Sequence, residues 1–361
     1  MQKFIEEFPI LKQYTYANTA GTGLIYDSLL EWRQGHDIDY LVGGSIMKMK
    51  SVQMITAAKE GLSAFFSCKQ DNVALVPNFS LGLNMLADSL DRSKTILLLE
   101  QDYPSVNWPF EDRGFKVHYA KVAANLEDNI KAALERTKTD VLALSVIQWV
   151  NGIKIDLAFL KTLKEAYPNL LIIADGTQFC GTDEFNFEAS GIDVLGASAY
   201  KWMLSGYGNG FLLFKDWAKQ HFNIKTIGFY AANGDKEKRD QVRFTKHFEP
   251  GHLDTLNFGS LKFSIDFLSS IGIQRIANQN RKLAAKAKSI FAAMDLLEDA
   301  VVSRTVHSTI FNIKGDNIRF QKCTEADIVC AQRGDGIRFS FHFYNTENDI
   351  DRIAEVLKTT L

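Results

Sequence analysis

The chain is poor in cysteine: only four of its 361 residues are cysteines, at positions 68, 180, 323 and 330. None of them has C-x-x-C spacing, which argues against a zinc site or a disulfide framework. We therefore expect no metal, and a reducing cytoplasm is the simplest location.

An excess of charge of one sign is also missing, because 41 basic and 43 acidic residues leave a net charge of -2. This balance gives no reason to expect nucleic acid or an anionic membrane surface as a partner. The longest apolar runs, such as residues 141–150, are far too short to span a membrane. The amino terminus, MQKFIEEFPI, carries acids and lacks the apolar core of a signal peptide.

What the sequence does contain is a pair of strand patterns that end in reactive side chains. Residues 170–174 form an apolar run typical of a strand buried on both faces, and Asp175 follows directly. A second apolar segment, residues 192–197, leads shortly afterwards to Lys201. A carboxylate and a lysine at two strand ends indicate a ligand site at the carboxyl edge of an α/β sheet.

These two residue types match what pyridoxal phosphate (PLP) requires. A lysine can hold the cofactor aldehyde as a Schiff base, and a carboxylate can keep the pyridine nitrogen protonated so that the ring accepts electrons. The stretch resembles the fold-type-I, class V aminotransferase and cysteine desulfurase family, whose pattern is approximately D-G-A-Q followed by S-x-H-K-W. The corresponding residues are 175–178 (DGTQ) and 198–202 (SAYKW).

The resemblance implies a role for each residue of this pattern. Asp175 would pair with the pyridine nitrogen, Gln178 would face the ring hydroxyl, and Lys201 would form the internal aldimine. Ser198 and Tyr200 would belong to the cofactor site, with Tyr200 in place of the usual phosphate-binding histidine. A phenol can still donate a hydrogen bond to phosphate.

Other segments of the resemblance bring further residues to the cofactor. A strand pattern at residues 73–76 leads into a helix pattern, and N–H groups at a helix start suit a phosphate. Phe79 and Ser80 would lie there, although Ser80 as a simple helix cap is the alternative. In the following segment an aromatic residue would stack on the pyridine ring, with Tyr103 as the first choice and Trp108 as the second.

Three segments would contact the substrate. Asn18, Thr19 and Ala20 resemble the family's Y-L-N-N-A-x-x-G segment, which lies over the cofactor face. Gln148 stands in the place of the S-x-x-T-G segment and would face the ring hydroxyl or the substrate. Arg338 begins a close match to the signature R-x-S-x-x-x-Y-N-T, whose arginine binds the substrate α-carboxylate, a task suited to a planar guanidinium.

One motif implies a partner subunit. Residues 248–252 resemble F-E-x-G-T, whose threonine reaches the phosphate of the neighbouring subunit's cofactor, and His252 replaces that threonine. The resemblance therefore implies a homodimer with shared active sites. A lone surface or structural histidine is the alternative.

The alternation of strand and helix patterns up to residue 214 predicts an α/β fold with a mostly parallel, doubly wound sheet. Together with the resemblance, it predicts a fold-type-I PLP-dependent transferase with a large domain and a small α+β C-terminal domain. We expect an N-terminal segment at 1–24 that contacts the active site. A large PLP-binding domain would follow at 25–255, and a linker helix and the small domain at 256–361.

The first hypothesis for function is a PLP-dependent aminotransferase that acts on a small amino acid, with the Lys201 amine as general base. The alternative is a PLP-dependent lyase of the cysteine desulfurase or selenocysteine lyase type. From other classes, a cofactor-binding module without catalysis or a plain nucleotide-binding α/β protein would also fit the pattern. Retention of both Asp175 and Lys201 argues against these two.

The cysteines bear on the desulfurase alternative, because a desulfurase needs a thiolate on a mobile loop near the cofactor. Cys323 has a suitable separation from Arg338 but lacks the family's H-C-A-like loop, and we expect it at the start of a short helix. Cys330 lies in an apolar run too close to Arg338 for a flexible loop. The sequence therefore predicts that cysteine is at best a poor source of persulfide.

Overall fold

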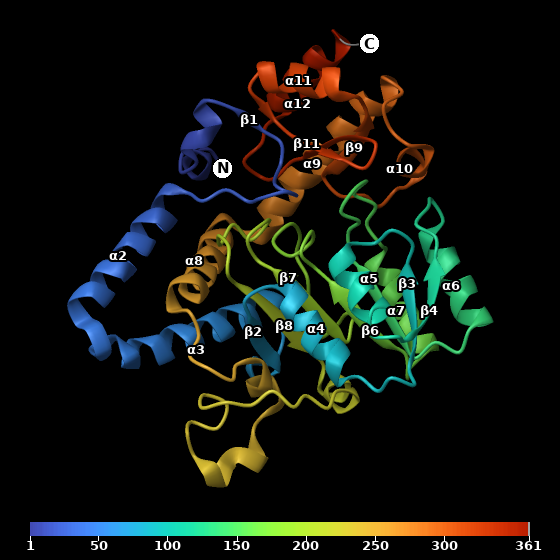
Figure 1. Ribbon diagram of the computed structural model, residues 1–361. Helices are drawn as coiled ribbons and strands as arrows, with labels where there is room; N and C mark the ends of the chain where they lie inside the picture. The colour runs from blue at the N-terminus through green and yellow to red at the C-terminus, as the bar shows by residue number, and fades with distance from the viewer. Residues whose placement is uncertain (360–361) are drawn as a thin grey trace.

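The protein is described by a computed structural model that covers residues 1–359. Its centre is a seven-stranded sheet with the order β2-β8-β7-β6-β5-β3-β4 (Figure 1). The strands are β2 Val73–Val76, β3 Thr95–Leu99, β4 Lys116–Ala120, β5 Val141–Ser145, β6 Leu171–Asp175, β7 Val194–Ser198 and β8 Gly210–Phe214. Strand β8 is antiparallel to both of its neighbours, and the other neighbouring pairs are parallel.

Helices cover both faces of this sheet, as the sequence predicts. Successive residues of the central strands contribute to different apolar clusters, since Leu97 and Leu142 lie in one cluster and Ile96 and Val141 in the other. Side chains of α4 and α5 pack on one face, and those of α3, α6, α7 and α8 pack on the other. Strands buried on both faces explain the near-continuous apolar runs in the sequence.

The helices are α1 Gln2–Ile5, α2 Asp27–Gly43, α3 Met47–Phe66, α4 Phe79–Ser89, α5 Pro104–Glu111, α6 Leu126–Arg136, α7 Leu157–Ala166, α8 Thr255–Ile271, α9 Ile273–Ala293, α10 Asp299–Ser303, α11 Asn317–Glu325 and α12 Glu347–Lys358. Three short 3-10 helices, Asp216–His221, Lys236–Gln241 and Phe244–Phe248, lie in the segment between β8 and α8. None of the helices within residues 1–359 combines the length and apolar composition needed to cross a bilayer.

The C-terminal part is a smaller α+β unit, as predicted. A three-stranded antiparallel sheet has the order β11-β12-β9, with bounds Ala331–Arg333, Gly336–Ser340 and Ile310–Lys314. Strand β1 (Thr15–Tyr16) pairs in parallel with β10 (Ile328–Val329), so the N-terminal segment lies against the C-terminal part (Figure 1). Helix α12 begins with a capping box formed by Thr346 and Asp349.

The prediction for Cys323 is wrong in one respect. Helix α11 begins at Asn317, because the side chain of Asp316 caps it by accepting a hydrogen bond from the Arg319 backbone N–H. Cys323 therefore lies in the last turn of this helix and is fully buried. The aspartate cap seven positions upstream of Cys323 is the signal that the sequence analysis did not use.

A buried ion pair holds the segment that precedes α8 against the central sheet. Glu249 is fully buried, and its Oε1 accepts hydrogen bonds from Lys59 Nζ (2.7 Å) and the Leu75 N–H (3.1 Å). Its Oε2 accepts one from Lys246 Nζ at 2.8 Å. Burial lowers the pKa of Lys59, and the Glu249 carboxylate opposes this effect. The chain leading to His252 is thus anchored on α3 and β2.

We expect the substitution Glu249→Ala to lower the free energy of unfolding by about 3–5 kcal/mol, because it leaves the Lys59 ammonium buried without its partner. Guanidinium denaturation measures the change. The matched control is Asp266→Ala, which breaks an exposed pair with Lys262 and should cost less than about 1 kcal/mol. Equal losses in the two variants would contradict this account of Glu249.

Candidate active site

The parallel strands β5, β6 and β7 bring the predicted residues to one edge of the sheet. Asp175 is the last residue of β6 and pairs in register with Ser145 of β5 and Gly196 of β7. Lys201 follows the end of β7 by three residues. A narrow cavity at this edge is lined by Tyr103, Ser145, Ile147, Trp149, Asp175, Thr177, Gln178 and Lys201.

The charged pair at this edge is buried, with Asp175 5% and Lys201 6% exposed. Burial raises the pKa of Asp175 to about 6, against the opposing effects of Thr177 and Lys201, while Asp102 adds to the rise. Burial likewise lowers the pKa of Lys201 to about 8, and Asp175 opposes the shift. A lysine with this pKa is partly neutral at physiological pH, as a nucleophile or general base must be.

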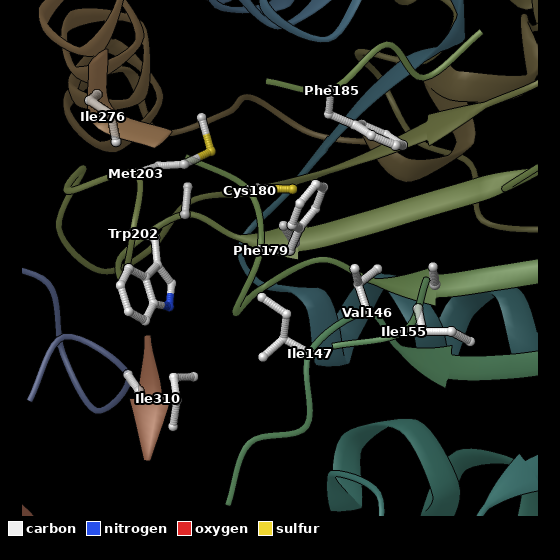
Figure 2. Close-up of a cluster of buried hydrophobic side chains, with 14 of the residues drawn as sticks. Val146, Ile147, Ile155, Phe179, Cys180, Phe185, Trp202, Met203, Ile276 and Ile310 are labelled. Atoms are coloured by element: carbon white, nitrogen blue, oxygen red, sulfur yellow. The ribbon is translucent and has the colours of Figure 1, made fainter. Parts of the chain in front are cut away.

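The side chain of Gln178 is held from both ends. Its Nε2 donates to the Ala20 carbonyl at 3.1 Å, and its Oε1 accepts from Trp202 Nε1 at 2.7 Å. Trp202 belongs to a buried apolar cluster that also contains Ile276 of α9 and Ile310 of β9 (Figure 2). Gln178 thus connects the N-terminal segment, the lysine-bearing turn and the core beneath it.

Two predicted cofactor residues meet at the start of α4. The backbone N–H of Phe79 donates to Ser198 Oγ at 2.9 Å, and the Ser198 N–H donates to Thr177 Oγ1 at 3.0 Å. This chain of bonds places the N-terminus of α4 beside the ends of β6 and β7. Such an end supplies N–H groups and a favourable dipole for an anion.

Ser80 is not the cap of this helix, and that alternative is wrong. Asn78 is the cap, since its Oδ1 accepts from the Leu81 N–H at 2.9 Å. The Ser80 hydroxyl instead donates to Ser105 Oγ at 2.7 Å. Ser80 therefore links α4 to α5 at this end of the site.

The two candidates for the aromatic residue that would stack on the cofactor ring, Tyr103 and Trp108, lie in different surroundings. Lys201 Nζ lies 5.7 Å from the ring centroid of Tyr103, whose ring meets Trp149 edge-on. Trp108 lies on the outer side of α5 and is 60% exposed, so the second choice for the stacking residue is wrong. The Tyr200 ring stacks on the Tyr207 ring with centroids 4.4 Å apart. Lys201 Nζ lies 5.5 Å from the centroid of the Tyr200 ring.

Arg338 reaches the site from β12. It is 2% exposed, and its Nη1 donates to the Trp149 carbonyl at 2.6 Å. Burial lowers the pKa of Arg338 to about 10, and the neighbouring Arg333 adds to this effect. The small C-terminal sheet therefore delivers a guanidinium to the loop that follows β5.

The N-terminal residues form the next wall. Asn18 forms a bridge with Ser340 of β12, and the Ala20 N–H donates to Ser340 Oγ at 2.9 Å. The Thr19 hydroxyl is bonded to the Tyr344 hydroxyl at 2.5 Å. These contacts hold the segment against the C-terminal unit, with the Ala20 carbonyl on Gln178.

Several buried polar atoms of this region have no hydrogen-bond partner. Within residues 1–359 they include Asn18 Oδ1, Gln148 Nε2, Trp149 Nε1 and Arg338 Nε. Each such group costs free energy unless a bound molecule pairs with it. Three donors and one acceptor from three segments of the chain, beside a buried lysine and carboxylate, fit a polar cofactor and its substrate.

The sequence reading missed residues that the fold brings to the cavity. Trp149 and Ser145 line it directly, and the buried Asp102 accepts hydrogen bonds from the backbone N–H groups of Tyr103 and Ser145. Burial raises the pKa of Asp102. The only sign of these residues in the sequence was their position next to predicted site residues: Trp149 follows Gln148, and Asp102 precedes Tyr103.

His252 lies apart from Lys201 within this chain. Its ring stacks on Phe229, with centroids 5.9 Å apart, and it lines a hollow beside α2 and α3. Gln148, in contrast, lines a cleft that adjoins the cavity at Lys201.

The arrangement of Lys201, Asp175 and the start of α4 agrees with comparison to known proteins. The family model described as aminotransferase class-V matches residues 41–353. The chain belongs to the class V aminotransferase family. It is therefore an enzyme of a PLP-dependent, fold-type-I family, as the sequence patterns predict.

Curated relatives of this family member differ in activity. Isopenicillin N epimerase from Amycolatopsis lactamdurans is 24% identical over 84% of each chain. A probable cysteine desulfurase from Methanothermobacter thermautotrophicus is 22% identical over 98% of this chain and 96% of the relative. An uncharacterized aminotransferase from Bacillus subtilis is 20% identical over 98% and 97%.

Solved structures share the fold. A cysteine desulfurase from Thermococcus onnurineus NA1 superposes with a TM-score of 0.88 at 16% identity, covering 99% of this chain and 97% of that chain. The cystine C-S lyase C-DES superposes with a TM-score of 0.84 at 18% identity, covering 97% and 98%.

We expect PLP uptake by the cofactor-free protein to report the lowered pKa of Lys201, because only the neutral amine reacts. With a pKa of about 8, the uptake rate should rise about fivefold from pH 7 to 8 and only about twofold from pH 8 to 9. Absorbance spectroscopy follows the rate, and borohydride reduction with peptide mapping locates the cofactor.

Two variants test whether Lys201 is the amine that reacts with PLP. Asp175→Asn removes the charge that raises the Lys201 pKa, so its profile should shift to lower pH. Lys201→Ala should bind PLP without a covalent link. A reduced cofactor mapped to another lysine, or a tenfold rise per pH unit up to pH 10, would contradict the assignment.

Proposed function

We propose that the protein is an aminotransferase for amino acids, with Lys201 as the base and Arg338 as the carboxylate-binding residue. The observation that carries this choice over a desulfurase is the burial of the thiols. Cys323 is fully buried, and none of the cysteines within residues 1–359 lines the cavity at Lys201. The lysine amine, in contrast, lies in that cavity with a pKa of about 8.

The chain's own residues can divide the work of the reaction as follows. PLP, when bound, supplies a ring that accepts electrons from the substrate α-carbon. Asp175 would hold a proton on the ring nitrogen, and Tyr103 would cover the ring. The Ser80 N–H at the start of α4 would bind the phosphate, and the Phe79 N–H would join it on releasing Ser198 Oγ.

The substrate side of the site falls to other residues. Arg338 would fix the α-carboxylate, so that the α-hydrogen lies within reach of Lys201. Lys201 Nζ would then take the proton from the substrate α-carbon and return it on the cofactor side of the substrate nitrogen. The unpaired Asn18 Oδ1, Gln148 Nε2 and Trp149 Nε1 offer further hydrogen bonds to cofactor or substrate.

The cysteine environment supports transfer over desulfuration. Burial raises the pKa of Cys68 to about 12 and that of Cys180 well above its ordinary value. Cys330 is half-buried and contacts Cys323 beyond β10. A persulfide-forming enzyme needs an accessible thiolate at the cofactor, and none of these thiols meets that requirement.

Incubation of the PLP-loaded protein with amino acids and α-keto acids should give amino transfer. The double variant Cys323→Ser with Cys330→Ser should keep this activity, because neither thiol faces the cavity. Chromatography of the products, including the ratio of amino-acid enantiomers, measures transfer, elimination and racemisation together. Efficient conversion of cysteine to alanine that either single substitution abolishes would make the desulfurase alternative correct.

We also propose a homodimer that contains two shared sites. The corner between α2 and α3 exposes a set of large apolar side chains, with exposed fractions of 83% for Leu41, 82% for Val42, and 79% for Ile46 and Met49. A hollow of about 700 Å³ beside them is lined by both helices and by His252. Apolar patches of this kind mark association surfaces, and a second copy would bring His252 towards its partner's cofactor.

Light scattering should give a mass near twice the 40.6 kDa of one chain. The double variant Leu41→Glu with Val42→Glu should shift the protein towards monomer, because it places charges in the proposed interface. The matched control is Ile318→Glu, which changes a 65% exposed side chain on α11. A parent protein that is monomeric at micromolar concentration would rule out the dimer.

A further inference from the structure

The hairpin that carries Arg338 also carries a second arginine on the same face. Strands β11 and β12 pair Ala331 with Arg338 and Arg333 with Gly336. Directly paired residues, and residues two apart on a strand, project from one face of a sheet. Arg333 and Arg338 therefore share the face from which Arg338 reaches the Trp149 carbonyl.

The third strand of this sheet supports the position of Arg333. Asn312 of β9 pairs with Arg338, and its Nδ2 donates to the Arg333 carbonyl at 3.0 Å. The Asn312 Oδ1 is buried without a hydrogen-bond partner. Gly336, which pairs with Arg333, has no side chain, and the Asn312 side chain and the Ile313 carbonyl occupy the space that a Cβ there would fill.

Arg333 lacks a carboxylate partner within residues 1–359. Its side chain is exposed, and its Nη1 donates to the neighbouring Gln332 carbonyl at 2.7 Å. The positive charge acts on the site, since it contributes to the lowered pKa of both Lys201 and Arg338, after the larger effect of burial. Two guanidinium groups therefore converge on one ligand region.

A cleft of about 550 Å³ leads outward from this region. The hairpin turn at Gly334–Gly336 and Asn312 form one wall, and Gln148 and Trp149 form the opposite wall. Trp149 also lines the cavity at Lys201, so the cleft and that cavity adjoin at this side chain. The charged side chains along the cleft are mixed in sign: Glu100, Glu298 and Asp335 against Lys121 and Lys314. The net charge of the cleft therefore does not select a ligand. Selection must come from individual charged pairs between the ligand and the protein.

We propose that Arg333 binds a second carboxylate, carried on the side chain of the amino acid whose α-carboxylate Arg338 binds. The substrate class is then dicarboxylic amino acids, which narrows the proposed aminotransferase function and rests on it. Each arginine would pair with one carboxylate by charge-assisted hydrogen bonds, and the unpaired Gln148 Nε2 on the opposite wall of the cleft is a further neutral donor.

The test is a spectrophotometric titration of the PLP-loaded protein with acids and their uncharged isosteres: aspartate, asparagine, glutamate, glutamine and 2-aminoadipate. We expect one of the acids to bind at least about tenfold more tightly than its amide, a difference of about 1.4 kcal/mol. Arg333→Gln should remove this preference by weakening the acid alone, and Arg333→Lys should retain part of it.

Two variants serve as comparisons. Arg136→Gln removes a remote arginine that donates to its own helix on α6, and it should leave every affinity unchanged. Arg338→Ala should weaken acid and amide alike, because both carry an α-carboxylate. An acid-to-amide ratio near one in the parent, or an equal loss for both ligands in Arg333→Gln, would overturn the second carboxylate site.

Calorimetry separates failure of this site from failure of the proposed function. Glutarate carries two carboxylates and butyrate one, and neither needs chemistry at Lys201 to bind. We expect glutarate to bind the parent at least about tenfold more tightly than butyrate, with the preference lost in Arg333→Gln. Equal affinities overturn the site. A clear preference for glutarate without amino transfer supports the site and overturns the aminotransferase proposal.

Discussion

The structure depends on the burial of two opposite charges, Asp175 and Lys201, at one edge of a sheet. Removing a carboxylate and an ammonium from water is costly, and their mutual attraction repays the cost only in part. The pKa of Asp175 near 6 and that of Lys201 near 8 record this cost, because each shift favours the neutral form. As a result of this costly burial, the Lys201 amine can react near neutral pH.

Holding that pair in place requires contacts from both ends of the chain. Gln178 connects the turn after Asp175 to Ala20 and Trp202. The His342 ring donates from Nε2 to the Trp202 carbonyl at 3.0 Å, and this buried ring has a pKa lowered to about 3 by burial, so it stays neutral. The lysine-bearing turn is therefore bonded to the N-terminal segment and to the C-terminal unit at once.

The same region leaves several buried polar groups unpaired, in contrast to the buried carboxylates that support the fold. Buried Asp193 accepts hydrogen bonds from the Ile172 N–H, Lys164 and Trp217. Buried Glu249 accepts hydrogen bonds from Lys59 and Lys246. Around Lys201, by contrast, Trp149 Nε1 and Arg338 Nε lack partners. These two carboxylates are satisfied within the fold, whereas the unpaired groups around Lys201 are available to a ligand, at some expense in stability.

The sequence by itself determined the fold class and the central pair. Apolar strand patterns ending at Asp175 and leading to Lys201 are local, and parallel strands must bring such ends to one edge. The bounds of β2, Val73–Val76, agree with the strand pattern at residues 73–76 for the same reason, since that apolar pattern is local. Tertiary structure alone decided what surrounds the pair. Trp149 and Asp102 lie on loops and Arg333 lies on the short strand β11. The positions of these segments depend on packing between distant parts of the chain, and a short local pattern carries no record of that packing. The exposure of Trp108 and the burial of Cys323 were decided in the same way, because a single position in a short helix can face either core or solvent until its neighbours are in place.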